Sequence, residues 1–440
     1  MAAWRACPHA VAGAALLQSW GMGEKLVVVG QGRTGLTLAM RAVEAGFHVV
    51  GIDADEWRVK RLSAGESCVD EVGDGVLAAA HGSGRYAASA DYARAEGFDV
   101  CVITEPVAVR DGVPDLRPIG SAGEAVAPLL RPGATVILES TTYPGTTEEH
   151  LRALLEDGSG LHAPGDFFLG YSHQRIDPGN ARWRLDNTPK VVSGIDAASL
   201  ERITDFYGRI VREVVPVSSP RVAELCALLE SAFRQVNIAL VNEMSIFAGQ
   251  LGIDMWEAVD AASTKPFGFM RFTPGPGAGG QCPPIDPSQV SWNVKRGPGR
   301  TFRFAELAGD VNRSMPDHVV NRLALALNRR HLPLRGSRVL LMGLSYKKNV
   351  GDCRESASIE IAKSLRKLGA DVRAADPHAD DFLLPVGIEL VEPTSGELAA
   401  ADAVVVLTDH DCFDYELVQR SARFVFDARN RCHGPNVEKL

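Results

Sequence analysis

The stretch Lys25-Leu-Val-Val-Val-Gly-Gln-Gly-Arg-Thr-Gly35 decides the fold of this chain. It opens with a short apolar run rich in β-branched side chains, which is typical of a buried parallel strand. A G-x-G-x-x-G loop follows, and residues 36–45 then have a helical pattern. A second apolar run, 48–52, ends at Asp53. Strand, glycine loop, helix, strand and acid in this order predict a dinucleotide-binding βαβ unit.

Each glycine of this loop has a physical task. The three glycines provide a tight turn, let the backbone approach a pyrophosphate, and allow the helix to pack closely on the strand. The helix N-terminus offers amide donors and a positive dipole to the phosphates. Asp53 is expected to accept hydrogen bonds from the adenosine ribose, which favours NAD over NADP. The predicted NAD-binding residues here are Gly30, Gly32, Arg33, Thr34, Gly35 and Asp53.

The composition indicates a soluble, multi-domain, acidic protein. The 440 residues are 45% hydrophobic and 23% charged, close to the average for globular proteins. With 46 basic and 55 acidic residues the net charge is −9, so we expect no nucleic-acid partner. Eight cysteines are scattered without a C-x-x-C pair, which argues against a zinc site and fits the reducing cytoplasm. No apolar run is long enough for a membrane helix.

The pattern along the chain predicts an α/β protein with two Rossmann-like, doubly wound parallel-sheet domains joined by a long helical segment. We expect residues 1–22 to be a disordered N-terminal extension and residues 23–205 to form the NAD-binding domain. Residues 206–325, with a long helical pattern, are expected to form a central helical and dimerisation domain. A second α/β pattern over 326–440 lacks a clean glycine fingerprint and is expected to hold a different ligand. Other predicted strands are 99–103, 134–138, 190–193, 338–342, 371–375, 403–407 and 424–426.

Seven motifs occur in an order that is characteristic of one enzyme family. They are the glycine loop, Ser140-Thr-Thr-Tyr-Pro-Gly145, Arg175-Ile-Asp-Pro-Gly-Asn180, Gly279-Gly-Gln-Cys-Pro-Pro-Ile-Asp286, Tyr346-Lys-Lys-Asn349, Asp352-Cys-Arg-Glu-Ser356 and Thr408-Asp-His410. Together they resemble the UDP-glucose/GDP-mannose dehydrogenase family, nearest its UDP-N-acetyl-hexosamine 6-dehydrogenase branch. The resemblance implies a homodimer that oxidises C6 of a UDP- or GDP-sugar from alcohol to carboxylate with two NAD, between the two α/β domains.

The resemblance also implies roles for single residues. Cys282 would be the nucleophile that captures the aldehyde as a thiohemiacetal, which is then oxidised to a thioester and hydrolysed; a thiol is nucleophilic enough for this. Asp286 resembles the carboxylate that orients the catalytic water. Thr141 resembles the hydroxyl that positions the sugar or its water, and we also assign it to the cofactor site. The alternative for Cys282 is a small buried hydrophobic residue.

The substrate-binding residues are expected to lie in the central domain and in the second α/β domain. Lys347 and Arg354 resemble the nucleotide-sugar contacts of the second α/β domain, and such cations suit a pyrophosphate. The resemblance implies no metal. The substrate-binding residues are Arg234, Asn237, Lys265, Phe267, Gly279, Gly280, Tyr346, Lys347 and Arg354.

Three positions depart from the family's pattern at the catalytic end of the site. Gln174 stands where the family usually has a glutamate acting as general acid/base, and an amide cannot accept a proton. Ala227 and Ser231, one helical turn apart, replace a Lys and an Asn. Loss of one such preorganised donor typically costs about 10²–10³ in rate. The neighbouring His173 could serve as the base, since its unperturbed pKa of about 6.5 suits proton transfer; a plain core or solvent-facing imidazole is the alternative.

Three functions therefore stay open. The first is an NAD-dependent nucleotide-sugar 6-dehydrogenase with a rebuilt acid/base set. The second is an NAD enzyme of the same fold that stops at the aldehyde, or that epimerises a sugar carbon with no net oxidation; Cys282 argues against the redox-neutral form. The third is a silent homologue that binds NAD and a nucleotide sugar. Release of NADH with any nucleotide sugar would exclude the third.

Overall fold

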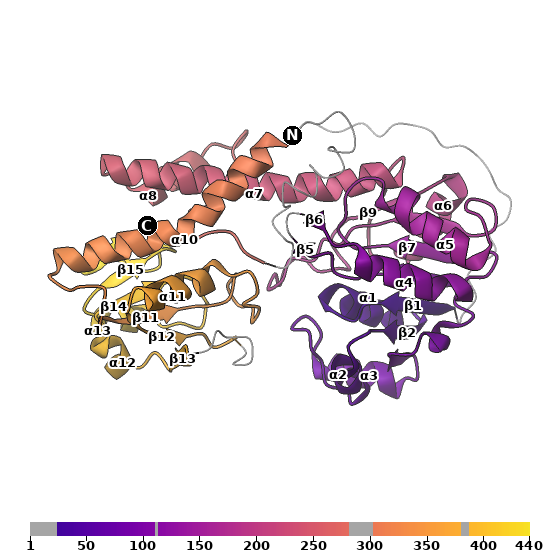
Figure 1. Cartoon of the computed structure of the whole chain (residues 1–440), viewed down its shortest axis with the longest axis horizontal. Helices are drawn as coiled ribbons and strands as arrows, with labels where there is room; N and C mark the ends of the chain where they lie inside the picture. Colours follow the sequence, from indigo (N-terminus) through magenta and orange to yellow (C-terminus); the bar gives the residue numbers. More distant parts are fainter. Residues whose placement is uncertain (1–23, 111–112, 281–301, 380–386) are drawn as a thin grey trace.

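The computed structural model describes residues 24–110, 113–280, 302–379 and 387–440. Two α/β lobes lie side by side, and the 32-residue helix α7 (Pro220–Leu251) runs along both of them (Figure 1). The predicted extension, 1–22, lies outside the described residues. None of the helices described is long and apolar enough to cross a membrane.

The first lobe contains an eight-stranded sheet in the order β10-β9-β8-β7-β4-β1-β2-β3. Its strands are β1 (Lys25–Val29), β2 (His48–Ile52), β3 (Tyr86–Ser89), β4 (Val100–Ile103), β7 (Thr135–Leu138), β8 (Phe168–Tyr171), β9 (Lys190–Gly194) and β10 (Val214–Pro216). Neighbouring strands are parallel except β8 and β9, which are antiparallel. Its helices are α1 (Arg33–Glu44), α2 (Glu56–Ser63), α3 (Asp74–Gly82), α4 (Arg117–Val126), α5 (Arg152–Ser159) and α6 (Ala197–Gly208).

Short helical turns and a small hairpin complete this lobe. They are the 3₁₀ turns Tyr92–Ala95 and Ala127–Leu129, the π-helical turn Thr146–Leu151, and the antiparallel pair β5 (Val109–Arg110) and β6 (Val113–Pro114). Apolar residues of β1, β4 and β7 are buried on both faces of the sheet, as expected for a sheet covered by helices on both sides. The glycine loop follows the carboxyl end of β1, at the edge of the sheet where ligands bind in such folds.

The second lobe contains a six-stranded, fully parallel sheet in the order β13-β12-β11-β14-β15-β16. Its strands are β11 (Arg338–Met342), β12 (Asp371–Ala375), β13 (Glu389–Leu390), β14 (Ala403–Val406), β15 (Val425–Asp427) and β16 (Val437–Lys439). Its helices are α11 (Ala357–Lys367), α12 (Ser395–Ala400) and α13 (Tyr415–Ser421). The prediction of two doubly wound α/β domains is confirmed.

Within the described part of the segment between the lobes there are three helices: α7, α8 (Met255–Ser263) and α10 (Arg303–Arg329). Ser219 caps α7 through a hydrogen bond to the Val222 amide, Pro220 occupies the first turn, and Gly252 ends the helix with a φ of 69°, as its sequence signals predict. Asn242 of α7 donates to Asn312 of α10 across 3.0 Å in a buried contact. This polar contact fixes the alignment of the two long helices.

Candidate active site

The glycine loop has the shape that a dinucleotide requires. Gly30 follows β1 with a φ of 88°, a left-handed conformation that favours glycine. A Cβ on Gly35 would lie 1.8 Å from the Gly30 carbonyl oxygen, so α1 packs on the strand only with glycine there. A Cβ on Gly32 would meet nothing within 4 Å. The open side of Gly32, at the N-terminus of α1, is therefore a suitable place for the pyrophosphate of NAD.

Asp53 lies at the end of β2, beside this loop, as predicted for the ribose contact. Its carboxylate accepts a 2.7 Å hydrogen bond from the Gln31 amide and two from Arg58 Nη1, at 2.8 and 2.9 Å. The side chain is 6% exposed. The local pattern predicted Asp53, whereas Arg58 was missed because an arginine in the first turns of α2 has no distinctive sequence signal.

The loop that carries Thr141 is held in place by α7. Glu224 of α7 accepts hydrogen bonds from the Gly145 amide (2.6 Å), the Thr147 amide (2.9 Å) and the Thr147 hydroxyl (2.8 Å). Burial raises the pKa of this carboxyl to about 7, against the opposing effect of these donors. Thr141 itself is half-buried, four residues before the point where Glu224 binds the chain.

The segment after β8 places His173 and Arg175 against α7. His173 is 2% exposed, and its Nε2 lies 3.3 Å from Glu230 Oε2. The Arg175 guanidinium also bonds to Glu230. Burial lowers the pKa of His173. Although burial raises the pKa of Glu230, hydrogen bonds from His173 and Arg175 lower it to about 2. Burial thus favours the neutral form of the imidazole predicted as a base, which is held against the 41% exposed side chain of Glu230.

The three altered positions surround this cluster. The Gln174 side-chain oxygen accepts a hydrogen bond from the Ile176 amide, so the amide group is turned toward its own backbone. Ala227 is 5% exposed and Ser231 is half-buried on α7. Neither offers a charge in place of the family's lysine.

The segment before the cysteine loop contacts the second lobe. A Cβ on Gly279 would lie 2.5 Å from the Glu355 carbonyl oxygen, and a Cβ on Gly280 would lie 2.7 Å from the Tyr346 ring. Gly280 also has a φ of 118°. The chain can therefore approach Tyr346 only with glycine at these positions. Cys282 and Asp286 lie outside the described residues, so their predicted roles stay predictions.

Lys347 and Arg354 lie on the same segment of the second lobe but have different partners. Lys347 Nζ donates to Asp177 Oδ1 (2.5 Å) and to the Pro178 carbonyl oxygen (2.6 Å), both in the first lobe. Arg354 donates to both carboxylate oxygens of Asp352, at 2.9 and 2.8 Å. Its side chain is 56% exposed. A fixed, exposed guanidinium suits recognition of a diphosphate.

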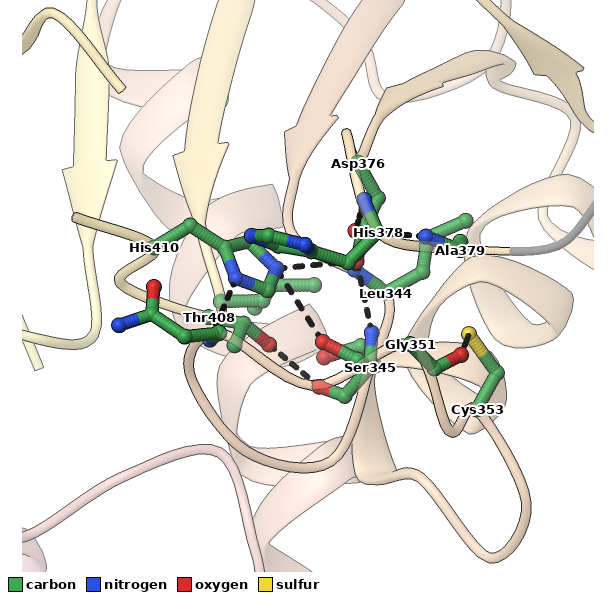
Figure 2. Close-up of polar contacts among 12 residues, drawn as sticks. Leu344, Ser345, Gly351, Cys353, Asp376, His378, Ala379, Thr408 and His410 are labelled. Atoms are coloured by element: carbon green, nitrogen blue, oxygen red, sulfur yellow. Dashed lines mark hydrogen bonds and ion pairs between the residues drawn. The ribbon is translucent and has the colours of Figure 1, made fainter. Parts of the chain in front are cut away.

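A buried polar cluster shapes the loop that carries these cations. Figure 2 shows Asp376, Ser345 and His410 pointing toward one another. His410 Nε2 lies 3.1 Å from both Asp376 Oδ2 and Ser345 Oγ, while its Nδ1 accepts from the Asn349 amide at 2.9 Å. Carboxylate and hydroxyl face the same ring nitrogen, so this is not the relay arrangement of a Ser-His-Asp nucleophile. The cluster instead ties the ends of β11, β12 and β14 together.

The remaining predicted substrate residues lie on or after α7. Although burial raises the pKa of Asp177, hydrogen bonds from Lys347 and Asn180 lower it, and the charge of Arg234 adds to this lowering. The Asn237 amide donates to the Phe233 carbonyl oxygen at 2.7 Å, along the helix. Lys265 Nζ lies 5.1 Å from the Phe267 ring centroid, and Phe267 is 71% exposed. The structure thus places Arg234 near Lys347 and leaves Lys265 and Phe267 on an exposed segment.

Comparison with known proteins gives a consistent result. The chain matches three family models: the UDP-glucose/GDP-mannose dehydrogenase NAD binding domain over 24–211, central domain over 221–314, and UDP binding domain over 340–434. It is 34% identical to the UDP-N-acetyl-D-glucosamine 6-dehydrogenase of Pseudomonas aeruginosa, covering 88% of this chain and 91% of the relative. The chain belongs to the UDP-glucose/GDP-mannose dehydrogenase family.

Other members of the family agree in sequence and in structure. A UDP-N-acetyl-D-mannosamine dehydrogenase of Methanococcus maripaludis strain C7 is 31% identical, covering 92% of this chain and 93% of the relative. The solved UDP-D-ManNAc dehydrogenase of Pyrococcus horikoshii superimposes with a TM-score of 0.84 at 27% identity, covering 94% and 99% of the two chains. The predicted family, its α/β fold, NAD as cofactor and assignment to the NAD-dependent oxidoreductases are confirmed.

One further cluster within this dehydrogenase has the composition of a metal site. Ligand atoms of His173, Cys226 and Glu230 lie within 4.8 Å of one another. Arg175 Nη2, however, lies 3.8 Å from Cys226 Sγ and bonds to Glu230. The arginine already supplies the positive charge that a metal ion would bring, so we assign no metal here.

Proposed function

We propose that the enzyme oxidises C6 of a UDP-hexose or UDP-N-acetylhexosamine to the uronate through a covalent intermediate on Cys282. The observation that carries this proposal is the meeting of three segments. Arg33 of the glycine loop lies 3.8 Å from Asp352 in the second lobe, and the chain leading to Cys282 packs on Tyr346 of that lobe. The cofactor loop, the nucleotide-binding segment and the residues that lead into the cysteine loop, Gly279 and Gly280, therefore lie close to one another.

The chemistry follows from these positions. The glycine loop and Asp53 would hold NAD, which would supply the two-electron oxidant for each of two oxidations at C6, so that two NADH would form per sugar. Between them the Cys282 thiol adds to the aldehyde carbon, and the second oxidation leaves a thioester. Water then cleaves the carbon–sulfur bond, which releases the acid and restores the thiol. Thr141 and Asp286 would position the sugar and the water.

The nature of the sugar rests on the relatives. Those most similar in sequence include enzymes named for UDP-N-acetyl-D-glucosamine and UDP-N-acetyl-D-mannosamine, and the second lobe matches a UDP binding domain. We therefore favour a UDP-N-acetylhexosamine over a GDP-sugar. Uronates of this kind serve polysaccharide or secondary-metabolite biosynthesis, which we propose as the setting. We place the enzyme in the cytoplasm, since the described cysteines are free thiols.

We propose that the enzyme is a homodimer formed through α7. Large apolar side chains on this helix, each 44–66% exposed, recur at intervals of three, four and seven residues: Val222, Leu225, Leu229, Phe233, Leu240, Met244, Phe247 and Leu251. This spacing aligns them on one helix face. An exposed apolar stripe of this length is typical of a protein interface. We retain the division into an NAD-binding domain (23–205), a central domain (206–325) and a nucleotide-sugar domain (326–440).

The test counts NADH while the mass of the protein is followed during reaction with NAD and a panel of UDP- and GDP-sugars. Full oxidation predicts two NADH per sugar with turnover. The Cys282→Ser variant is expected to lose turnover. No NADH and no altered sugar would overturn the proposal in favour of a silent binding protein.

A second candidate function is favoured by Gln174, Ala227 and Ser231. If these replacements stop the reaction early, one burst of NADH with a sugar-sized adduct on Cys282 is expected. A changed sugar that requires NAD without net NADH would instead show a redox-neutral epimerase. Each of these outcomes contradicts the full oxidation.

A further inference from the structure

Arg33 of the glycine loop reaches out of the NAD-binding lobe. Its Nε lies 2.9 and 3.2 Å from the two carboxylate oxygens of Glu71, which belongs to the same lobe. Its Nη1 lies 3.8 Å from Asp352 Oδ2 in the second lobe. Glu71 therefore holds the guanidinium near its base, and the far end is directed across the boundary between the lobes.

Asp352 lies between Arg33 and Arg354, the arginine that we expect to contact the nucleotide. Its two oxygens accept hydrogen bonds from the Arg354 guanidinium at 2.9 and 2.8 Å, and Oδ1 also accepts one from the Arg354 backbone amide at 3.0 Å. Although burial raises the pKa of Asp352, Arg354 and the more distant charge of Arg33 lower it. Glu71, Arg33, Asp352 and Arg354 thus form a row of alternating charges from one lobe to the other.

The exposure of these groups decides how strongly they interact. The side chains of Arg33, Glu71 and Asp352 are 13%, 17% and 5% exposed, so solvent screens them less than an open surface pair. The Arg354 side chain, at 56%, is the exposed end of the row. A change at Arg33 should therefore alter Asp352 and, through it, Arg354, which is exposed and can contact a ligand.

We propose that Arg33 is a positioning residue for the nucleotide-sugar site, acting through Asp352 on Arg354, although it belongs to the cofactor loop. Without the charge of Arg33, the Asp352 carboxylate keeps Arg354 as its cationic partner. It loses the contact with Arg33 that holds it from the opposite lobe. Arg354 then pairs more tightly with Asp352 and is less available to a diphosphate. This inference rests on the proposed function only in taking UDP as the nucleotide.

The test is calorimetric titration of the full-length enzyme with UDP in the absence of NAD. Arg33→Gln is expected to weaken UDP binding by roughly threefold to tenfold, and Arg33→Lys is expected to recover part of the loss. The matched control is Arg41→Gln on the same helix, since Arg41 pairs with Glu44 and the Ile210 carbonyl oxygen inside the NAD-binding lobe. That variant should bind UDP as the parent does.

A double-mutant cycle separates positioning from a general loss of structure. In an Asp352→Asn background, Arg33→Gln should cause little further loss of UDP affinity. An Arg33→Gln variant that changes only NAD affinity, with UDP binding unaltered, would overturn the proposal. Additive losses in the cycle would also contradict it. Because UDP binding needs no turnover, failure of the oxidation chemistry would leave this result standing.

Discussion

Gln174 is the departure from the family's pattern that bears most directly on the proposed chemistry. A carboxylate at this position could exchange a proton with the sugar or the water, whereas an amide can only donate and accept hydrogen bonds. The structure turns the Gln174 oxygen toward the Ile176 amide, and the adjacent His173 is buried against Glu230. His173, the base predicted from the sequence, is therefore already engaged with Glu230 and Arg175.

Gln174→Glu should therefore speed the step that needs a proton acceptor. General acid–base groups contribute about 10²–10⁴ in rate, so we expect release of the acid from the Cys282 thioester to rise by about tenfold or more. Rapid-quench measurement of free uronate after the NADH burst follows this step. Gln174→Leu, of similar size but without a proton acceptor, is the control. Equal rates for the glutamate variant and the parent enzyme would show that another group already performs this task.

At the residue scale, the sequence predicted residues that belong to one local motif, but not the contacts between residues far apart in the chain. The glycines and Asp53 lie within one βαβ unit, so their spacing alone predicts their geometry. Glu224 contacts Gly145 and Thr147 from 77 to 79 positions away. Nothing local to a glutamate in a helix distinguishes one that binds a remote loop from one that faces solvent.

At the scale of elements, the apolar runs predicted most of the central strands, whereas the interior strand β8 and the edge strands β3 and β10 were missed. β8 contains Gly170, and a Cβ added at this position would lie 2.0 Å from the Ser193 carbonyl oxygen of β9. The close antiparallel approach of these strands requires this glycine, which also interrupts the apolar run from which a strand is recognised. β3 and β10 are short and partly exposed, so no continuous apolar run marks them.

The apolar stripe on α7 makes an element-scale prediction. Leu229 is the most exposed side chain of the stripe, at 66%, and we expect it to be buried in the proposed homodimer. Leu229→Glu loses this apolar burial in both subunits and places two carboxylates in the interface, which should weaken dimerisation by about a hundredfold or more. Light scattering across a dilution series measures the effect. The control is Leu368→Glu, at an exposed leucine outside the stripe, and a parent enzyme that is monomeric would contradict the interface.

At the scale of the whole molecule, the way the lobes meet could not be predicted from the sequence. The motifs predict Lys347 as a nucleotide contact, and in the structure its ammonium also donates to Asp177 and to the Pro178 carbonyl oxygen of the opposite lobe. A Cβ on Gly179 would lie 3.2 to 3.5 Å from Val350 and the backbone of Lys348 and Asn349. The Asp-Pro-Gly-Asn motif (177–180) thus contacts the second lobe, and it also follows closely after His173 and Gln174 in the chain.

Lys347→Gln should disturb both the docking of the lobes and the binding of the nucleotide sugar. We expect KM for the sugar nucleotide to rise by roughly tenfold with a smaller change in kcat, because the loss affects binding more than the chemical step. Amide hydrogen exchange over residues 175–180 should also become faster. Lys348→Gln is the matched control, since Lys348 pairs with Asp411 within its own lobe.

The Asp177→Asn variant decides between the two roles of Lys347. It keeps the ammonium but replaces the charged partner in the other lobe by an amide. If docking causes the rise in KM, this variant should reproduce both the higher KM and the faster exchange. If Lys347 acts only by contacting the nucleotide, Asp177→Asn should leave KM near its parent value. An unchanged KM in Lys347→Gln itself would contradict both roles, and binding would then depend on Arg354 and the row of charges that positions it.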